Sequence, residues 1–188
     1  MSQKNGYLKL IIGPMFAGKS SELLRIVSKY TAIDKKIITI NHILNCRYGT
    51  SKISTHDNKT LKTNVICETL GEIKDDILKH IDIIVVEELQ FFKDAFYTIQ
   101  YWVDKLGKTV IAAGLDGDYQ RKPFGDVLRL VPHADEVIKL TALCAVCKDG
   151  TPGIFSLKLE PNLCGQISVG SKTKYDAVCR KHFNDFHK

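Results

Sequence analysis

Short apolar segments alternate with amphipathic ones from residue 7 to residue 113 of the chain. The apolar segments are rich in isoleucine, valine and leucine and have the length of strands: residues 7–12, 36–40, 82–86 and 108–113. The segments between them carry apolar side chains at helical spacing: residues 20–33, 71–81 and 93–106. The continuous runs at 82–86 and 108–113 are typical of buried parallel strands. Strands separated by helices predict an α/β fold, a parallel sheet with helices on both faces.

The remaining segments have different patterns. Residues 41–62 are polar and irregular, which predicts a long loop or hairpin of the kind that is often functional or disordered. From about residue 142 onward glycine is more frequent, cysteine and histidine cluster, and residues 153–159 and 166–169 are β-prone. We therefore expect an α/β domain over residues 1–142 and a small C-terminal module over residues 143–188.

Composition narrows the class of protein. Of the 188 residues, 44% are hydrophobic and 26% charged, which excludes a disordered or collagen-like chain. No apolar run approaches the roughly 20 residues of a membrane span, and the first residues lack a signal-peptide pattern. We therefore expect a cytoplasmic or nuclear protein. The net charge of +6 suits polyanions, including nucleotides and nucleic acid, although a solvated surface explains it equally well.

A phosphate-binding motif follows the first predicted strand. Residues 13–20 match GxxxxGK[ST] at every fixed position and open a predicted helix: Gly13, Pro14, Met15, Phe16, Ala17, Gly18, Lys19 and Ser20. The glycines let amide N–H groups turn toward a phosphate, and the helix N-terminus adds partial positive charge. In such a loop the Lys19 side chain reaches the β- and γ-phosphates and the Ser20 hydroxyl ligates Mg²⁺. Core packing is the default for Met15 and Phe16.

Two carboxylates follow the buried strand 82–86. Glu87 and Glu88 are expected at the carboxyl end of that strand, where ligands bind in open α/β sheets. Adjacent residues point to opposite faces, so one carboxylate can hold a metal ion through water while the other accepts a proton from a substrate hydroxyl. The alternative is an exposed pair that only ends the strand.

Two pairs of metal-binding residues mark the C-terminal module. Cys144 and Cys147 form one pair, Cys179 and His182 the other, and this spacing predicts a tetrahedral Zn²⁺ site. Four protein ligands leave no open position, so the zinc would be structural. The alternative is a set of free thiols.

A glycine-rich loop over residues 114–125 follows the strand 108–113. Tyr119 and Phe124 can enclose a flat ring, and Arg121 and Lys122 can balance phosphate charge. A plain polar turn explains the same glycines.

The motifs occur together in one order: GPMFAGKS, CRYG, STHD, VVEELQFF, GLDGDYQRKPFG, KLTALCAVC and ISVGSKTKYDAVCRKHF. In this order they resemble the thymidine kinases of the cellular cytosolic and poxvirus type, P-loop kinases with a zinc-binding lasso domain, over roughly residues 8–183. The resemblance implies transfer of the γ-phosphoryl group of MgATP to the 5′-hydroxyl of thymidine. It also implies a homotetramer whose partner is a small nucleoside, not nucleic acid or a membrane.

The resemblance assigns roles to individual residues. Glu88 is the implied catalytic base, Lys19 and Arg47 supply charge balance, and ATP is bound by residues 13–20 and by Glu87 and Gln90. The implied nucleoside pocket comprises Met15, Phe91, Leu115, Tyr119, Phe124, Ser156, Gln166, Ile167, Ser168, Val169, Gly170 and Tyr175. The chain departs from the family pattern by having Glu87 and Asn45 where that pattern has aspartate, and Ser156 where it has threonine.

Two other functions remain open at this point. A nucleic-acid-binding ATPase with a zinc ribbon would need a continuous basic groove. A regulatory nucleotide-binding module would bind ATP without turnover.

Overall fold

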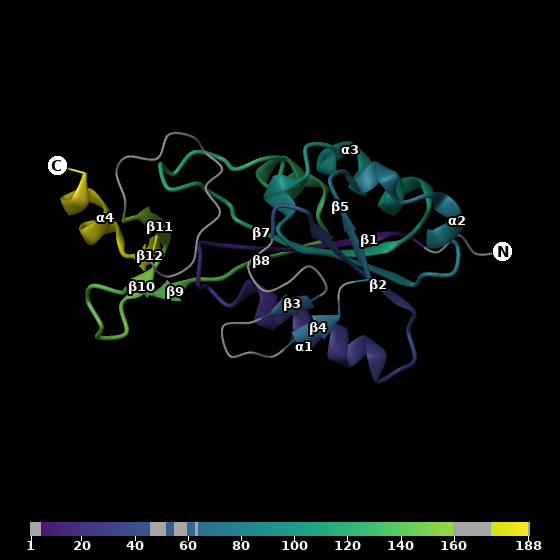
Figure 1. Ribbon diagram of the computed structural model, residues 1–188, viewed down its shortest axis with the longest axis horizontal. Coiled ribbons are helices and arrows are strands. Elements are labelled where there is room, and N and C mark those ends of the chain that lie inside the picture. The colour runs from purple at the N-terminus through teal and green to yellow at the C-terminus, as the bar shows by residue number, and fades with distance from the viewer. Residues whose placement is uncertain (1–4, 46–51, 55–59, 63, 160–173, 188) are drawn as a thin grey trace.

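The structure of the chain is a computed structural model that describes residues 5–45, 52–54, 60–62, 64–159 and 174–187 (Figure 1). Six parallel strands form its central sheet in the order β5-β2-β6-β7-β1-β8. These strands are β1 (Tyr7–Ile12), β2 (Ile37–His42), β5 (Val65–Cys67), β6 (Ile83–Val86), β7 (Thr109–Gly114) and β8 (Glu136–Lys139). Strands β1 and β7 pair in parallel, with Tyr7 opposite Thr109 at one end and Ile12 opposite Gly114 at the other. The predicted α/β fold with a parallel sheet is confirmed.

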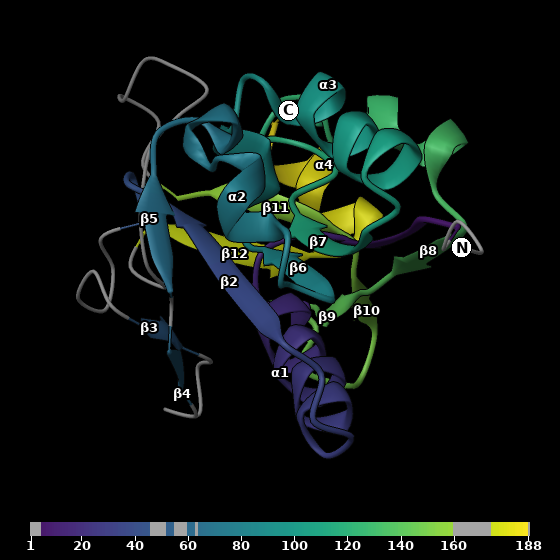
Figure 2. The ribbon, with the colours of Figure 1, turned by 90° about the vertical axis from the view of Figure 1, so that its right-hand side faces the viewer.

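Each face of the sheet has its own apolar core because strand side chains alternate between faces. One face, with Leu10, Ile84 and Val110, packs against Ile99 and Trp102. It is covered by α2 (Asp75–Leu78), α3 (Ala95–Gln100), the π-helical turn η3 (Tyr101–Lys105) and the 3₁₀ segments η1 (Leu70–Glu72) and η4 (Leu128–His133). The other face packs against the helix α1 (Lys19–Thr31) through residues that include Leu23 and Ile26. Figures 1 and 2 show α1 on the side of the sheet opposite α2 and α3.

The continuous helix predicted over residues 71–81 is wrong. The backbone N–H groups of Leu70 and Gly71 donate to the carboxylate of Asp94, at 3.1 and 2.8 Å, and hold a single 3₁₀ turn there. Ile73 then adopts an extended conformation, and α2 starts only at Asp75. Ile77, expected on a buried face, is 51% exposed. The turn is fixed by a carboxylate far along the chain, which local apolar spacing does not reveal.

The polar segment 41–62 contains a short antiparallel hairpin. Strand β3 (Lys52–Ser54) pairs with β4 (Thr60–Lys62), with Ile53 opposite Leu61. One of the two predicted alternatives, a hairpin, is therefore present.

The C-terminal elements lie at one end of the molecule (Figure 1). Strand β9 (Ala142–Leu143) pairs with β10 (Pro152–Gly153), β11 (Phe155–Lys158) pairs with β12 (Tyr175–Val178), and α4 (Arg180–Phe186) follows. These elements contact the phosphate-loop region directly, because Ala142 and Ala177 pack against Ala17. The β-prone segment 153–159 is confirmed as β11, whereas the segment 166–169 lies outside the described residues.

Within the part of the chain that the structure describes, the helices are all too short or too polar to cross a membrane.

Candidate active site and metal centre

The phosphate motif forms a tight loop between β1 and α1. Gly13 has φ of +145°, and a Cβ at this position would lie 2.3 Å from the carbonyl oxygen of Leu140, so only glycine fits. Gly18 is the N-cap of α1, and the helix starts at Lys19. The Lys19 ammonium donates to the carbonyl oxygen of Pro14 at 2.6 Å, which holds the lysine over the loop. This is the geometry in which a positive charge and a helix N-terminus face a bound phosphate.

The two oxygen ligands predicted for Mg²⁺ are in contact. The Ser20 hydroxyl donates to Oε1 of Glu87. Glu87 is buried directly after β6, and its backbone N–H donates to the carbonyl oxygen of Ile40 at 3.0 Å. A hydroxyl and a carboxylate placed together suit a hard divalent cation that also binds phosphates. Glutamate in place of aspartate therefore still reaches the serine.

Glu88 has a left-handed backbone conformation, with φ of 54° and ψ of 42°. It precedes the 3₁₀ turn η2 (Leu89–Phe91), and the Phe91 N–H donates to its carbonyl oxygen at 3.0 Å. Its carboxylate accepts a hydrogen bond from Nε2 of Gln90 at 2.6 Å. Left-handed residues other than glycine are uncommon, and such conformations gather at functional sites. The side chain is half-buried rather than fully exposed, which argues against a pair that merely ends the strand.

The apolar side chains that the sequence assigned to a nucleoside pocket lie together. Buried residues from four separate segments form one group: Met15, Phe91, Leu115, Phe124 and Tyr175. The partly buried Phe16 and Tyr119 pack against this group. The rings of Phe91 and Phe124 meet edge to face with centroids 5.8 Å apart. We call these seven residues the apolar cluster. It adjoins both the phosphate loop, through Met15 and Phe16, and the turn after Glu88, through Phe91.

Ser156 joins the C-terminal elements to the phosphate loop. It is buried on β11, and its hydroxyl accepts a hydrogen bond from the Met15 backbone N–H at 2.9 Å. The serine that replaces the family threonine thus lies against the loop and beside the apolar cluster.

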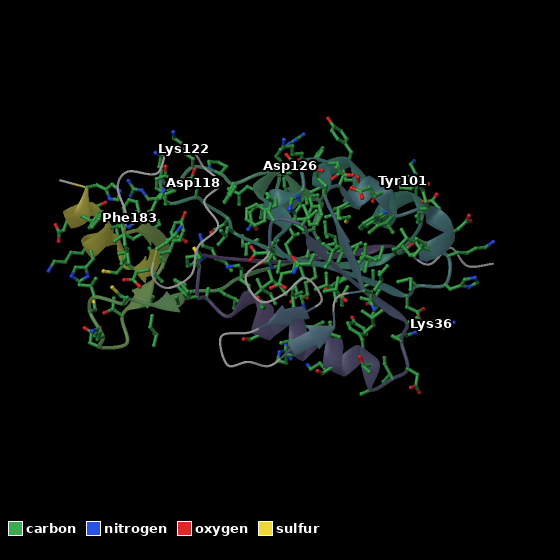
Figure 3. All side chains as sticks on the ribbon, viewed as in Figure 1. Lys36, Tyr101, Asp118, Lys122, Asp126 and Phe183 are labelled. Atoms are coloured by element: carbon green, nitrogen blue, oxygen red, sulfur yellow. The ribbon has the colours of Figure 1, made fainter. Side chains whose placement is uncertain are left out.

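The loop after β7 is shaped by Asp118 and attached to the C-terminal elements by Arg121. Oδ1 of Asp118 accepts hydrogen bonds from the backbone N–H groups of Gln120 and Lys122, at 2.8 and 2.9 Å. The Arg121 guanidinium lies 4.7 Å from the ring centroid of Phe183, and Figure 3 shows Asp118 and Lys122 on the same side of the molecule as Phe183. Arg121 thus makes a cation–π contact between the two parts of the chain.

Two residues beside the apolar cluster escaped sequence reasoning. Lys158 is buried on β11, and its ammonium lies 4.6 Å from the ring centroid of Tyr119. His42 is buried at the end of β2 with its ring 5.6 Å from Phe91 and 4.7 Å from Phe92, and burial lowers its pKa. Lys158 lies two residues after Ser156 on the same strand, and this alternation was a signal for its position.

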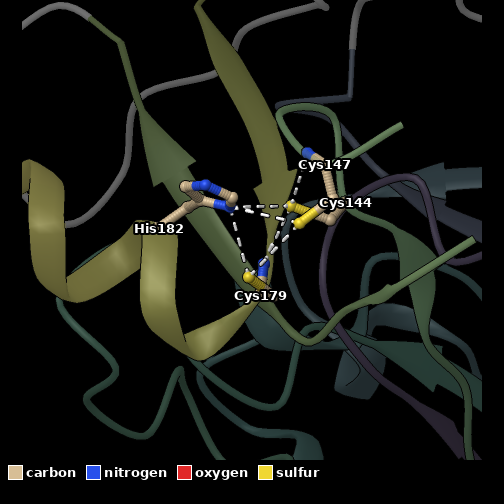
Figure 4. Close-up of side chains that lie close together, drawn as sticks. All are labelled: Cys144, Cys147, Cys179 and His182. Atoms are coloured by element: carbon tan, nitrogen blue, oxygen red, sulfur yellow. Dashed lines mark hydrogen bonds between the residues drawn. The ribbon is translucent and has the colours of Figure 1, made fainter. Parts of the chain in front are cut away.

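The four predicted zinc ligands converge (Figure 4). Their ligand atoms all lie within 4.8 Å of one another. The two Sγ atoms of Cys147 and Cys179 are 3.8 Å apart, and Nδ1 of His182 lies 3.3 Å from each of them and 3.6 Å from Sγ of Cys144. Tetrahedral zinc with ordinary bond lengths requires about 3.8 Å between sulfurs and about 3.6 Å between sulfur and nitrogen. The cluster is therefore compatible with zinc.

The surroundings of Cys144 favour its thiolate, whereas those of Cys147 do not. Burial alone would raise the pKa of the Cys144 thiol, but backbone N–H groups of Cys147 and Cys179 donate to its sulfur, at 3.5 and 3.3 Å, and lower the pKa to about 6. Burial and the neighbouring thiols raise the pKa of Cys147 to about 11. A cation among these sulfurs would favour the deprotonated form of each thiol.

Several residues of the sequence-predicted site lie outside the described residues. They are Arg47, Gln166, Ile167, Ser168, Val169 and Gly170.

Comparisons with known proteins point to one family. Residues 6–183 match the family model described as Thymidine kinase. The chain is 40% identical over 177 residues to a protein named thymidine kinase from Sheeppox virus (strain KS-1), covering 94% of this chain and 96% of that one. It is 39% identical over 184 residues to the thymidine kinase of Vaccinia virus (strain Western Reserve), covering 96% and 98% of the two chains.

Proposed function

The chain belongs to the thymidine kinase family, and from that premise we propose how its described residues phosphorylate thymidine at the 5′-hydroxyl in nucleotide salvage. One observation carries the proposal: the phosphate loop, the carboxylates Glu87 and Glu88, and the apolar cluster adjoin one another at one edge of the sheet. A triphosphate site and a site for a flat, weakly polar ring therefore flank a carboxylate.

The phosphate loop binds the triphosphate of ATP. The N-terminus of α1 faces the phosphates, and Lys19 balances their charge. Ser20 and Glu87 would hold Mg²⁺, which would neutralise charge that develops during transfer. Arg47 adds positive charge in this proposal.

The apolar cluster binds the nucleoside. Phe91, Phe124 and Tyr119 supply flat faces for the pyrimidine ring, and Leu115 and Met15 supply apolar walls. Ser156, Tyr175 and the segment from Gln166 to Gly170 complete the pocket. Deoxyuridine lacks only the thymine methyl group, so it should be accepted with a loss of about 1–2 kcal/mol.

Glu88 is the general base. Its carboxylate accepts the proton of the 5′-hydroxyl as that oxygen forms a bond to the γ-phosphorus and the bond from this phosphorus to the bridging oxygen of ADP breaks. The products are thymidine 5′-monophosphate and ADP. The enzyme contributes mostly position and charge balance, because the transition state of phosphoryl transfer is loose.

Zinc has a structural role in this proposal. Cys144, Cys147, Cys179 and His182 would hold it, and these residues anchor β12 and α4 next to the strand that carries Ser156 and Lys158. We further propose that residues 143–188 act as one zinc-binding lasso domain beside the α/β domain of residues 1–142, and that the enzyme works in the cytoplasm as a homotetramer.

The test is an ATP hydrolysis and transfer assay with the purified chain. We expect ADP formation that depends on thymidine and one 5′-monophosphate per ADP. ATP hydrolysis stimulated by DNA and independent of nucleoside would favour the ATPase alternative, and ATP binding without turnover would favour the regulatory module.

A further inference from the structure

The side chain of Gln90 connects the ends of two neighbouring strands. It is only 4% exposed, in the turn η2 after β6. Its Nε2 donates to Oε2 of Glu88 at 2.6 Å, and its Oε1 accepts the backbone N–H of Leu115, just after β7, at 3.0 Å. The carboxamide therefore lies between the proposed base and a wall of the apolar cluster.

The direction of this amide is fixed by its partners. The Leu115 N–H can only donate, so the end of the amide that faces it must be the oxygen. The NH₂ group is then directed toward Glu88, to which it can only donate.

The backbone of Gln90 has equally little room to move. A Cβ on Gly125 would lie 2.4 Å from the carbonyl oxygen of Gln90, and Gly125 has φ of +56°. A Cβ on Gly114 would lie 3.0 Å from Oε1 of Gln90. Only glycines at these positions let the two loops close around the side chain.

Glu88 by itself has weaker local support. Its left-handed backbone is a conformation that residues other than glycine rarely adopt, and the 3₁₀ turn η2 follows it. The hydrogen bond from Gln90 restricts the direction in which the Glu88 carboxylate points.

We propose that Gln90 is a positioning residue, which rests on Glu88 being the base: its clamped carboxamide holds the Glu88 carboxylate in the orientation that receives the 5′-hydroxyl proton. The resemblance placed Gln90 among the ATP-binding residues. Its side chain instead donates a hydrogen bond to the carboxylate of Glu88, the proposed base. Because the same amide binds Leu115, it also fixes the distance between the base and the pocket wall.

A double-mutant cycle tests this role. Gln90→Met keeps the size of the side chain but removes both hydrogen bonds, so kcat should fall roughly 10–100-fold while the KM values for thymidine and ATP change less than about threefold. In the Glu88→Gln background the same substitution should change kcat less than about threefold, because there is no carboxylate left to orient. Gln100→Met, in α3, is the matched control and should leave kcat unchanged.

A second variant gives a readout that a structural defect would not produce. Gln90→Glu retains an acceptor for Leu115 but donates to Glu88 only while the two carboxyls share a proton. Its kcat relative to the unsubstituted enzyme should therefore fall as the pH rises. Thermal unfolding and zinc content show whether each variant is folded.

The outcomes separate two failures. If Glu88→Gln retains near-normal kcat, Glu88 is not the base and the role of Gln90 is overturned with it. If Glu88→Gln is inactive as expected but Gln90→Met retains full kcat, or lowers kcat equally in both backgrounds, only the positioning role is overturned. A pH-independent loss in Gln90→Glu would contradict it as well.

Discussion

The phosphate loop and the apolar cluster differ in how the chain builds them. The loop is one contiguous segment, residues 13–20, shaped mainly by its own glycines and by the start of α1, with one hydrogen bond from the Met15 N–H to Ser156 of the C-terminal elements. The cluster gathers side chains from four separate segments, three of them following the neighbouring strands β6, β7 and β1 and one lying in the C-terminal elements. A contiguous site depends on local backbone geometry, whereas a gathered site depends on how whole elements pack. Damage to the C-terminal elements should therefore affect nucleoside binding before ATP binding.

Glu88 lies between the two regions, and its loss should have the largest effect. Glu88→Gln keeps the size of the side chain and removes its ability to accept a proton, so kcat should fall roughly 10²–10⁴-fold. The substitution leaves the phosphate loop and the apolar cluster intact, so KM for thymidine and KM for ATP should change little. Steady-state kinetics with varied thymidine and varied ATP measures both. Near-normal turnover would show that another group accepts the proton.

Loss of the metal centre should affect the apolar cluster more than the phosphate loop. Cys147→Ala removes one of four ligands, so the purified chain should lose zinc and the C-terminal elements should loosen, because metal binding and folding are coupled. KM for thymidine should then rise at least tenfold, by rough estimate, while ATP analogue binding changes only a few-fold.

Cys67→Ala is the matched control. Cys67 is buried in the core on β5, outside the metal cluster, and burial raises the pKa of its thiol to about 11. Elemental analysis should find about one zinc per chain in this variant and in the unsubstituted protein. An unsubstituted chain without zinc would refute the structural role of the metal.

Lys158 offers a milder test of the gathered site. Lys158→Met removes the cation from the Tyr119 ring, a contact worth about 0.5–2 kcal/mol. KM for thymidine should rise roughly three- to tenfold with little change in KM for ATP. Lys181→Met, at an exposed position in α4, should change neither. Equal rises in both KM values would mean that Lys158 supports the phosphate loop instead.

The smallest expected effect concerns His42, which lies beside the apolar cluster and should influence the pH dependence of the free energy of unfolding. Burial lowers the pKa of His42 below the ordinary value of 6.5, so the unfolded chain binds a proton more readily than the folded one. This group's contribution to the free energy of unfolding is therefore complete above pH 6.5 and is lost as the pH falls through the lowered folded pKa. Denaturant unfolding measured across this window should show a shallower pH dependence in His42→Gln. An unchanged slope would place the titration in another group.

The contiguous features were predictable from the sequence, and the gathered ones were predictable only in part. The pattern at residues 7–20 gave the strand, loop and helix because each depends on its immediate neighbours. The edge strand β8 was missed because its residues, Glu136 to Lys139, lack a continuous apolar run. The turn η1 depends on Asp94, and the Lys158 ammonium contacts the Tyr119 ring; no local pattern encodes either contact.

The Glu88 region shows the same limit. Its position after a buried strand was evident from the sequence, but its left-handed backbone and the amide that links it to Leu115 depend on the packing of two loops. Resemblance to a family identified six of the seven members of the apolar cluster, all but Phe16, whereas periodicity alone would have left Met15 and Phe91 as core residues.

The most direct test of the account is a crystal structure of the chain with thymidine and a non-hydrolysable ATP analogue. We expect the triphosphate on residues 13–20, the thymine ring within the apolar cluster, and the 5′-hydroxyl within about 2.6–3.2 Å of the Glu88 carboxylate. A nucleoside bound away from the apolar cluster, or a 5′-hydroxyl facing another acceptor while Glu88 points elsewhere, would contradict it.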